Sequence, residues 1–388
     1  MITLNKNSDR RVRKGHLWVF SNEIAAPPVS DLEPGSVHEL CDARGEFLGM
    51  VYACPSSLIA ARILCRNKVK IDVDFFHDRI QAALERRMRL FPERDAYRLV
   101  YGEADFLPGL VVDRYGRFLV VQSLTSGMDR FLEEVLEALI TILKPEGVYL
   151  RNDSPFRALE GLPQEKKPVY GSFPETVPIT SHGLTFLVDI PNGQKTGFYL
   201  DQESNRSLMK RYVASGAKGL DLFCYTGAWG LHAIAAGAAE MTAVDSSRGA
   251  LKLAEANAKI NGMLDRFGAV RDNVLDFLKK TQLTWDIIIL DPPAFIKSRS
   301  QIKDGLKGYI DLNRRSLGKL NPGGILITCS CSHHLDRAAF EDMLLSASRQ
   351  SGRELRILDS RGQGPDHPVL LSMPETRYLK VVVAQACK

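Results

Sequence analysis

The fold is decided by the stretch Leu220-Asp221-Leu222-Phe223-Cys224-Tyr225-Thr226-Gly227-Ala228-Trp229-Gly230. It begins as an apolar strand and passes through glycines into a helix. Gly227 and Gly230 allow the backbone to approach a ligand closely, because glycine has no Cβ. Their spacing differs from the phosphate-binding G-x-G-x-x-G pattern, and no lysine follows. The stretch therefore indicates either a ligand-binding turn of another kind or an ordinary strand-to-helix turn.

Strands and helices alternate on both sides of this stretch, from about residue 181 onward. Such alternation predicts an α/β fold with a parallel, doubly wound sheet covered by helices on both faces. Sheets of this type bind ligands at the carboxyl ends of their strands. We therefore expect a Rossmann-like domain over residues 181–388, with strands at Leu220–Phe223, Met241–Asp245, Trp285–Leu290 and Gly324–Thr328 and helices at Gly230–Ala239, Arg248–Asn261 and Asn273–Lys280.

The first 180 residues follow a different pattern. Residues 1–70 alternate short apolar runs with turns at Pro34-Gly35 and Arg44-Gly45, which predicts a small β-rich domain. Residues 71–180 combine helical and strand-like periods, which predicts a central α+β domain. Its expected elements are helices at Asp72–Leu90 and Met128–Leu143, strands at Gly109–Asp113 and Phe118–Gln122, and a strand at Gly147–Leu150.

Composition and charge limit the location and the partners. The 388 residues are 45% hydrophobic and 25% charged, as in globular proteins, and contain no apolar run long enough for a bilayer. A cytoplasmic protein without a membrane partner is expected, and seven scattered cysteines predict reduced thiols. The net charge is only +5, but Arg10, Arg11, Arg13 and Lys14 form a basic cluster. Such a cluster is suited to phosphates, or is solvated surface.

Acidic residues follow three strands of the predicted sheet. A carboxylate such as Asp245 can accept ribose hydroxyls, and an Asx side chain at Asp272-Asn273 can read an adenine amino group. With Asp221, these acids fit a sulfonium ligand that carries an ammonium, and fit a pyrophosphate poorly. The pattern favours S-adenosylmethionine over a nicotinamide cofactor. The candidate cofactor-binding residues are Asp221, Phe223, Tyr225, Thr226, Gly227, Asp245, Ser246, Asp272, Asn273 and Asp291.

The sequence Asp291-Pro292-Pro293-Ala294-Phe295 follows the strand Trp285–Leu290. Two prolines end the strand and stiffen the loop, so that a carboxylate and backbone carbonyls are fixed at the ligand edge. A plain strand-terminating turn is the alternative. Amino-group methyltransferases carry an aromatic residue directly after the prolines of a similar loop. Here Ala294 intervenes, which weakens the interpretation as an amino-group methyltransferase.

The strand that follows Gly323-Gly324 ends in Cys329-Ser330-Cys331-Ser332-His333-His334. Cys329 and Cys331 point to the same face of a strand, and Cys331 lies nearer the ligand edge. Carbon 5 of a pyrimidine attacks a methyl sulfonium only after a thiolate has added to carbon 6, so a cysteine has a use here. Cys331 is the candidate nucleophile, and Asp291 is suited to stabilise the adduct. For Cys331 the alternative is burial in the core, and for Cys329 burial in the core is the preferred interpretation. The spacing of the cysteines and histidines in this segment disfavours a zinc site, and no metal is expected.

At this point the sequence resembles a known family, the bacterial large-subunit (23S) ribosomal RNA cytosine-5 methyltransferases that begin with a PUA domain. The resemblance covers nearly the whole chain and is specific when the motifs are taken together. They are Lys14-Gly15-His16-Leu17-Trp18-Val19-Phe20-Ser21, Gly102-Glu103-Ala104-Asp105-Phe106-Leu107-Pro108-Gly109, Lys195-Thr196-Gly197-Phe198-Tyr199-Leu200-Asp201-Gln202, Asp291-Pro292-Pro293-Ala294-Phe295 and Ser330-Cys331-Ser332.

The resemblance implies three domains: an RNA-binding PUA domain (1–70), a central α+β domain (71–180) and a Rossmann-like methyltransferase domain (181–388). It implies that Cys331 is the nucleophile, and that Lys195, Thr196 and Phe198 lie close to S-adenosylmethionine. It also favours contacts of Arg10, Arg11, Arg13 and Lys14 with ribosomal RNA. The family usually has arginine after Asp-Gln, where this chain has Glu203, so a local contact must differ.

The leading hypothesis is methylation of carbon 5 of a cytosine in 23S ribosomal RNA. One alternative is an RNA methyltransferase that acts on a base amino group or another nucleotide position. Another is an RNA-binding ribosome assembly factor without catalysis, against which Asp221, Gly227, Asp245 and Asp291 argue. The sequence does not determine the oligomeric state; a homodimer is one state that it allows.

Overall fold

The computed structural model describes residues 1–387 of the chain. Its contacts divide the chain into two compact units. The first comprises Met1–Ile179, Val188–Leu200 and Pro365–Thr376, and the second comprises Thr180–Leu187, Asp201–Gly364 and the residues from Arg377 onward. The first unit therefore draws on a segment near the end of the chain, which the sequence did not predict. The division into domains 1–70, 71–180 and 181–388 stays a prediction.

A seven-stranded sheet forms the centre of the second unit, in the order β16-β15-β14-β17-β18-β20-β19. The strands β14 to β18 are parallel, as predicted. The sheet is not parallel throughout, because β20, in a stretch where the sequence predicted no strand, pairs antiparallel with both β18 and β19. A parallel pair needs a long crossover, usually helical, and no α-helix lies between β19 and β20. The strands are β14 (Lys218–Leu222), β15 (Glu240–Asp245), β16 (Phe267–Arg271), β17 (Trp285–Leu290), β18 (Leu320–Ser330), β19 (Leu355–Arg361) and β20 (Lys380–Ala386).

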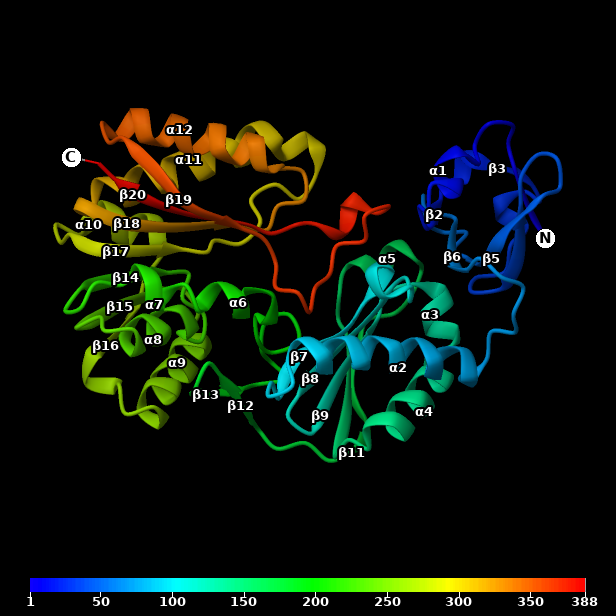
Figure 1. Ribbon diagram of the computed structural model, residues 1–388, viewed down its shortest axis with the longest axis horizontal. Coiled ribbons are helices and arrows are strands. Elements are labelled where there is room, and N and C mark those ends of the chain that lie inside the picture. Colours follow the sequence, from blue (N-terminus) through cyan, green and yellow to red (C-terminus); the bar gives the residue numbers. More distant parts are fainter. Residues whose placement is uncertain (388) are drawn as a thin grey trace. The chain divides into compact units, whose positions relative to one another are not determined.

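Helices cover both faces of this sheet. Figure 1 shows α11 and α12 on one side and α8 and α9 on the other. Burial on both faces explains why β17 is a continuous apolar run: Ile287, Ile288, Ile289 and Leu290 are at most 1% exposed. The helices are α6 (Glu203–Arg206), α7 (Met209–Tyr212), α8 (Ala228–Ala235), α9 (Arg248–Ile260), α10 (Val274–Lys280), α11 (Ile302–Gly318) and α12 (Arg337–Ser351).

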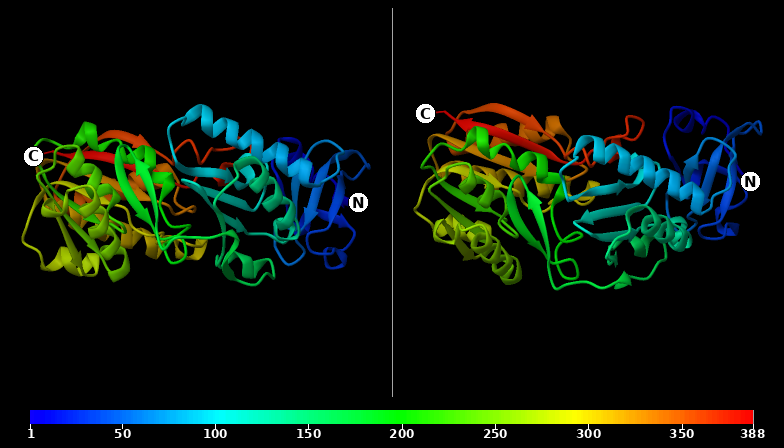
Figure 2. Two further views of the ribbon diagram at one scale, coloured as in Figure 1. Left: turned by 90° about the horizontal axis from the view of Figure 1, so that it is seen from below. Right: turned by 60° about the horizontal axis from the view of Figure 1, so that its bottom comes forward.

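The first unit contains two sheets. The six-stranded sheet has the order β2-β6-β5-β4-β1-β3, and the five-stranded sheet has the order β11-β10-β9-β8-β7. Figure 2 shows α2, in light blue, running along the five-stranded sheet. The elements are β1 (Ile2–Leu4), α1 (Arg10–Arg13), β2 (Trp18–Val19), β3 (Ile24–Ala26), β4 (Val37–Cys41), β5 (Phe47–Ala53), β6 (Ala61–Cys65), α2 (Val73–Leu90), β7 (Ala96–Tyr101), β8 (Leu110–Tyr115), β9 (Phe118–Ser123), α3 (Ser126–Arg130), α4 (Leu132–Leu143), β10 (Gly147–Asn152), α5 (Phe156–Leu159) and β11 (Glu165–Gly171); β12 (Val177–Ser181) and β13 (Leu184–Val188) form a separate two-stranded sheet.

The two predicted helices of the central region have different outcomes. Asp72 caps α2, because its carboxylate accepts a hydrogen bond from the backbone N–H of Phe75 at 3.3 Å, and the helix ends at Leu90 as predicted. The predicted helix at residues 128–143 is broken into α3 and α4. The break falls at Phe131, whose ring packs against Phe76 at a centroid distance of 5.3 Å. Packing of one aromatic ring thus overrides the local helical pattern.

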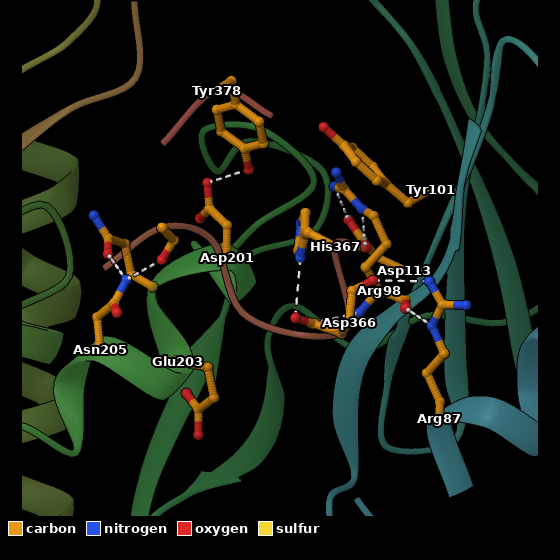
Figure 3. A network of polar contacts seen from close by, with 12 residues as sticks. Arg87, Arg98, Tyr101, Asp113, Asp201, Glu203, Asn205, Asp366, His367 and Tyr378 are labelled. Atoms are coloured by element: carbon orange, nitrogen blue, oxygen red, sulfur yellow. Dashed lines mark hydrogen bonds and ion pairs between the residues drawn. The ribbon is translucent and has the colours of Figure 1, made fainter. Parts of the chain in front are cut away.

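Hydrogen bonds join the parts of the first unit. The indole of Trp18, on β2, donates to the carboxylate of Glu103 at 2.8 Å. The buried guanidinium of Arg87, on α2, donates to both carboxylate oxygens of Asp105 and to the backbone carbonyl of Asp366. Figure 3 shows Arg87 and Asp366 in this network. These contacts hold the segment Pro365–Thr376 in the first unit, although about 280 residues of chain separate it from α2.

Candidate active site

A left-handed turn connects β14 to α8 in the second unit. Phe223, Tyr225 and Gly227 have φ values of 62°, 48° and 77°. A Cβ on Gly227 would lie 2.8 Å from the ring of Phe267, so both the backbone conformation and the space require glycine there. The turn brings the backbone N–H of Gly230 to the carboxylate of Asp221, at 2.9 Å. The turn between β14 and α8 is therefore held by a hydrogen bond to the carboxylate of Asp221, a residue of the same segment.

Three carboxylates lie at the ends of neighbouring strands. Asp221 belongs to β14, Asp245 ends β15, and Asp291 follows β17. The carboxylate of Asp245 accepts hydrogen bonds from the backbone N–H groups of Tyr225 (3.0 Å) and Ser247 (2.9 Å). Burial raises the pKa of Asp221 to about 7, and the charges of Asp291 and Asp245 add to this shift. The edge of the sheet is therefore strongly acidic.

Two buried oxygens in this turn have no hydrogen-bond partner among the residues that the structure describes. They are Oδ1 of Asp221, which is fully buried, and Oγ1 of Thr226, which is 1% exposed. A buried polar atom without a partner is unfavourable, so both atoms favour a ligand that supplies donors. S-adenosylmethionine carries an ammonium, a sulfonium, ribose hydroxyls and an adenine amino group. The residues of this turn therefore fit that cofactor.

The loop after β17 is held by two side chains to which the sequence had assigned no role. Oδ2 of Asp291 accepts hydrogen bonds from the indole N–H of Trp229 (3.1 Å) and from the amide of Gln202 (3.0 Å). The side-chain amide of Asn205 in turn donates to the side-chain oxygen Oε1 of Gln202 at 2.8 Å. Trp229 lies in the first turn of α8, directly after the glycine turn. An indole in the first turn of the helix that follows the glycine turn is the sequence signal that could have identified Trp229 as a residue of the site.

The two cysteines at the end of β18 lie in different environments. Cys329 is fully buried, which confirms the preferred interpretation, and burial raises its pKa well above the ordinary value. Cys331 is partly exposed. Ser330 and Ser332 are fully buried, and both hydroxyls lie 3.0 Å from the hydroxyl of Tyr309 on α11. Because side chains alternate along an extended chain, the inward-facing serines hold Cys331 away from Tyr309 and toward the opposite side.

The hydroxyl of Tyr309 also organises the loop that contains the two prolines. The backbone N–H of Phe295 lies 3.5 Å from this hydroxyl, and the N–H of Ile296 donates to the hydroxyl of Ser332 at 3.2 Å. The loop after Asp291 and the end of β18 are therefore joined through one cluster of hydroxyl groups. No local sequence pattern indicates Tyr309, which lies mid-helix in α11.

Replacing Tyr309 by Phe is expected to lower the free energy of unfolding by about 1–3 kcal/mol, because buried serine hydroxyls lose their partner. Methyl transfer should also fall, since the position of Cys331 is then less well defined. Thermal unfolding and initial rates measure the two effects. Tyr212→Phe is the matched control, because among the described residues the Tyr212 hydroxyl has one hydrogen bond, a long one of 3.5 Å to the carboxylate of Asp359. An equal change in both variants would contradict the role of Tyr309.

Some predicted cofactor residues have other contacts. The Asn273 side chain caps α10, because its oxygen accepts hydrogen bonds from the backbone N–H groups of Leu275 and Asp276. Asp272 forms an ion pair with Lys280 at 3.2 Å. Ser246 is exposed, and its backbone carbonyl accepts a hydrogen bond from Arg271. Their contacts with the cofactor stay predictions.

Lys195, Thr196 and Phe198 belong to the first unit. The hydroxyl of Thr196 donates to the carboxylate of Asp113 at 2.5 Å, and Phe198 is 2% exposed. The ammonium of Lys195 lies 4.3 Å from the centroid of the Tyr199 ring. Their predicted proximity to the cofactor likewise stays a prediction.

Glu203, at the position where the family usually has arginine, is buried and forms an ion pair with Arg206 at 2.7 Å. It also accepts a hydrogen bond from the hydroxyl of Ser181 at 2.7 Å. Burial alone would raise the pKa of Glu203, but the charge of Arg206 and the Ser181 hydrogen bond lower it below the ordinary value. Glu203, which differs from the usual arginine of the family, therefore has its charge paired and hydrogen-bonded within the second unit.

Within residues 1–387, no group of His, Cys, Asp and Glu side chains is arranged to hold a metal ion. None of the helices described is long and apolar enough to cross a membrane.

Comparisons with known proteins identify the family. The PUA-like domain family matches residues 2–66, and the S-adenosylmethionine-dependent methyltransferase family matches residues 164–375. Two proteins named ribosomal RNA large subunit methyltransferase I, from Erwinia tasmaniensis and Klebsiella pneumoniae subsp. pneumoniae, are 36% and 37% identical to this chain. The alignments cover 98% of this chain and 97% and 96% of those proteins. The chain belongs to the ribosomal RNA large subunit methyltransferase I family.

A solved structure agrees with this assignment at the level of the fold. A putative S-adenosylmethionine-dependent methyltransferase from Streptococcus mutans superposes with a TM-score of 0.85 over 99% of both chains, at 24% identity. Membership of the methyltransferase I family confirms the predicted PUA-like and Rossmann-like domains and the cofactor, S-adenosylmethionine. The acidic edge and the unpartnered oxygens of Asp221 and Thr226 belong to the matched methyltransferase region.

Proposed function

We propose that this chain methylates carbon 5 of a cytosine in 23S ribosomal RNA, with Cys331 as the nucleophile. The observation that carries the proposal is the contrast at the end of β18: Cys329 is fully buried, whereas Cys331 is partly exposed between two anchored serines. The same hydroxyl cluster ties this segment to the loop after Asp291. The names of the relatives support ribosomal RNA of the large subunit as the substrate.

In the proposed reaction, the Cys331 thiolate adds to carbon 6 of the cytosine, and the electron pair of the carbon 5–carbon 6 double bond becomes available at carbon 5. S-adenosylmethionine supplies the methyl group as an electrophilic carbon bonded to a sulfonium. After carbon 5 is methylated, its proton leaves to a base, and the bond between carbon 6 and Sγ breaks to return the thiolate. Cys331 thus activates the ring and is regenerated in each cycle.

Asp291 is suited to bind the cytosine ring. Its carboxylate is fixed by Trp229 and Gln202, so its orientation is set before substrate arrives. A fixed carboxylate can accept a hydrogen bond from the amino group of cytosine, and it then holds the ring in place while the adduct forms, without reorganisation of the protein. We therefore assign Asp291 to stabilisation of the covalent adduct.

The alternative of base amino-group methylation has less support from the contacts of Phe295. In that chemistry an aromatic residue after the prolines would be available to stack on the target base. Here the ring of Phe295 packs on Tyr309, at a centroid distance of 4.7 Å, and joins the hydrophobic core beside α11. The chain therefore uses this aromatic residue for packing.

The proposal is tested with undermethylated 23S ribosomal RNA and labelled S-adenosylmethionine, followed by nucleoside analysis. We expect 5-methylcytosine. RNA with 5-fluorocytosine at the target site should form a covalent complex with the protein that survives denaturation, because fluorine cannot leave as the carbon 5 proton does. Methylation of an amino group, without a trapped complex, would overturn the proposal. Cofactor binding without any methyl transfer would favour the assembly factor.

We assign contacts with RNA to the basic cluster of the PUA-like domain. Its four residues are expected to contribute unequally to binding, because some of them already form ion pairs. Arg11 forms an ion pair with Glu23 at 2.9 Å, and Arg13 pairs with Asp9, Asp42 and Glu46. Arg10 and Lys14 are exposed, and neither forms an ion pair with any residue in the range 1–387 that the structure describes. Free cations release more counterions on binding phosphates than cations that are already paired. We therefore propose Arg10 and Lys14 as the main phosphate contacts of the cluster, with Arg11 and Arg13 secondary.

Replacing both Arg10 and Lys14 by Gln is expected to weaken RNA binding and to reduce the slope of log K against log salt by about 0.7–0.9 per lost contact. Binding titrations between low and moderate salt measure this slope. The double variant Lys252→Gln/Lys259→Gln is the matched control, because both lysines are exposed on α9 and form no ion pair within the described part of the chain. Equal slopes for the two double variants would contradict the assignment.

A further inference from the structure

A buried lysine lies beside the candidate nucleophile. Lys380 is the first residue of β20, pairs in register with Ser330 on β18 and is only 5% exposed. Its ammonium group donates hydrogen bonds to the backbone carbonyls of Ser332 (2.6 Å) and Tyr378 (2.7 Å). Burial of a lysine is rare unless the charge is paired or the group becomes neutral. The position of Lys380 therefore requires an explanation.

Both acceptors of Lys380 are neutral carbonyl groups, and in the part of the chain that the structure describes no carboxylate lies within ion-pair distance of its Nζ. The nitrogen is tetrahedral and has one direction left after the two carbonyl contacts. In the ammonium form this direction holds a third N–H, and in the neutral amine it holds the lone pair. One position on Nζ is thus available for proton exchange.

The surroundings fix Lys380 in place. Tyr378, whose carbonyl accepts from Lys380, also donates its own hydroxyl to the carboxylate of Asp201 at 2.6 Å (Figure 3). Ser332 is held by Tyr309 through the hydroxyl contact at 3.0 Å. The two carbonyls that bind Nζ therefore belong to anchored residues, one of them directly after Cys331.

Charges couple Lys380 to Cys331. Burial lowers the pKa of Lys380 to about 8, and among the surrounding groups the thiolate of Cys331 opposes this shift most. Arg337 and Asp336, at the start of α12, act on Lys380 with opposite signs. A pKa of about 8 lies close to the ordinary thiol value of about 8.5. Proton exchange between a thiol and this amine is therefore nearly balanced.

The other titratable groups around this segment are poor partners for the thiol. Tyr309, on α11, has a raised pKa because it is buried, and its hydroxyl already contacts Ser330 and Ser332. Burial and the charge of Lys380 lower the pKa of His333, whose ring lies 5.6 Å from that of Tyr378. Cys329 is buried, with a strongly raised pKa. Lys380 is therefore the best-placed group to act on Cys331.

We propose that Lys380 is a positioning residue that takes the thiol proton of Cys331 and holds the resulting thiolate as an ammonium–thiolate pair. The S–H bond breaks, its electron pair stays on Sγ, and the proton bonds to the lone pair of the neutral Nζ. The net charge of the pair stays zero. When the thiolate is eliminated from carbon 6 of the cytosine, the pair is restored for the next cycle. This inference rests on the proposed role of Cys331 as the nucleophile.

The test measures the pH dependence of iodoacetamide alkylation of the full-length protein, without RNA, by mass spectrometry of the peptides. Cys331 and Cys387 are the two cysteines that are not buried, so Cys387 reports on the reagent in each sample. We expect Cys331 to react with a midpoint at least about one pH unit below the ordinary 8.5. In Lys380→Met the midpoint should rise, with about tenfold slower alkylation of Cys331 at pH 7. Lys380→Arg keeps a cation but cannot take the thiol proton, so it should restore the low alkylation midpoint through its charge alone.

The methylation rate gives a second readout. In Lys380→Met the acid limb of the pH profile should move upward with the alkylation midpoint, while binding of S-adenosylmethionine stays unchanged. A Cys331 midpoint of 8.5 or above in the wild type would overturn the inference even if the Met variant fails to fold. An unchanged midpoint in a folded Met variant would also overturn it. Full activity of Cys331→Ala would instead refute the proposed function, because that result does not depend on Lys380.

Discussion

Replacing Cys331 by Ala is expected to reduce methyl transfer by roughly 10³-fold or more, because carbon 5 of cytosine is then never activated. The side chain is partly exposed and its neighbouring serines carry the local hydrogen bonds, so the substitution removes little packing. We therefore expect the Ala variant to fold and to bind S-adenosylmethionine as the wild type does. Rates with labelled cofactor and calorimetric titrations measure the two properties.

Cys329→Ala is the matched control for this experiment. Cys329 lies two residues before Cys331, within β18, and is fully buried, so its loss should change stability more than catalysis. The covalent mechanism requires that only the Cys331 variant fails to produce 5-methylcytosine. If the Cys331 variant methylates at the wild-type rate, the nucleophile is elsewhere or unnecessary, and base amino-group methylation becomes the leading hypothesis.

Asp221→Asn is expected to have the second largest effect, with opposite signs for cofactor affinity and for stability. The carboxylate has one unpartnered oxygen in a fully buried position, which favours a cationic ligand. Loss of a hydrogen bond to a charged group is worth about 1.5–3 kcal/mol, so affinity for S-adenosylmethionine should fall by roughly 10- to 150-fold. Calorimetry of the wild type and the variant measures this change.

The effect on stability follows from the pKa of Asp221. Burial raises it from 3.8 to about 7, so between these values the folded chain binds a proton that the unfolded chain does not. The stabilising contribution of Asp221 is therefore full below about pH 4 and is lost as the pH rises through 7. Ionisation in the folded protein then costs on the order of 4 kcal/mol, at 1.36 kcal/mol per pKa unit, as an upper value.

Asn removes this penalty, so in the absence of cofactor the variant should have a higher melting temperature at pH 8 than the wild type. The expected shift is about 2–4 °C for each kcal/mol gained. Affinity of the wild type for S-adenosylmethionine should rise with pH through 7, and this rise should be absent in Asp221→Asn. The control is Asp265→Asn, which changes the same charge on an exposed residue. A melting temperature at pH 8 that falls in Asp221→Asn would contradict the assignment.

The sequence by itself determined the elements with strong local patterns. The strand Trp285–Leu290 has the predicted bounds because four consecutive isoleucine and leucine residues are buried on both faces of the sheet. The helix α2 begins at Val73, one residue after the predicted start at Asp72, and α9 begins at the predicted Arg248. Periodicity, caps and proline act within a few residues, so such elements can be derived from the sequence.

The same holds for part of the candidate site. Asp221, Asp245 and Asp291 come at the ends of strands, and a parallel sheet brings such ends together whatever the rest of the chain does. The alternation of side chains along an extended strand also placed Cys329 and Cys331 on one face, with Cys331 nearer the ligand edge, before any contact was known. Both inferences needed only the positions of the strands in the sequence and the alternation of side chains along a strand.

Only the tertiary structure decided the contacts between residues far apart in the chain. Tyr309 meets Ser332, Trp229 meets Asp291, and Lys380 meets Ser332, over sequence separations of 23, 62 and 48 residues. Antiparallel pairing of β20 and the ion pairs of Arg13 are decided in the same way. Each depends on how distant elements pack, and packing is set by the whole core, whereas a sequence pattern reports only on near neighbours along the chain.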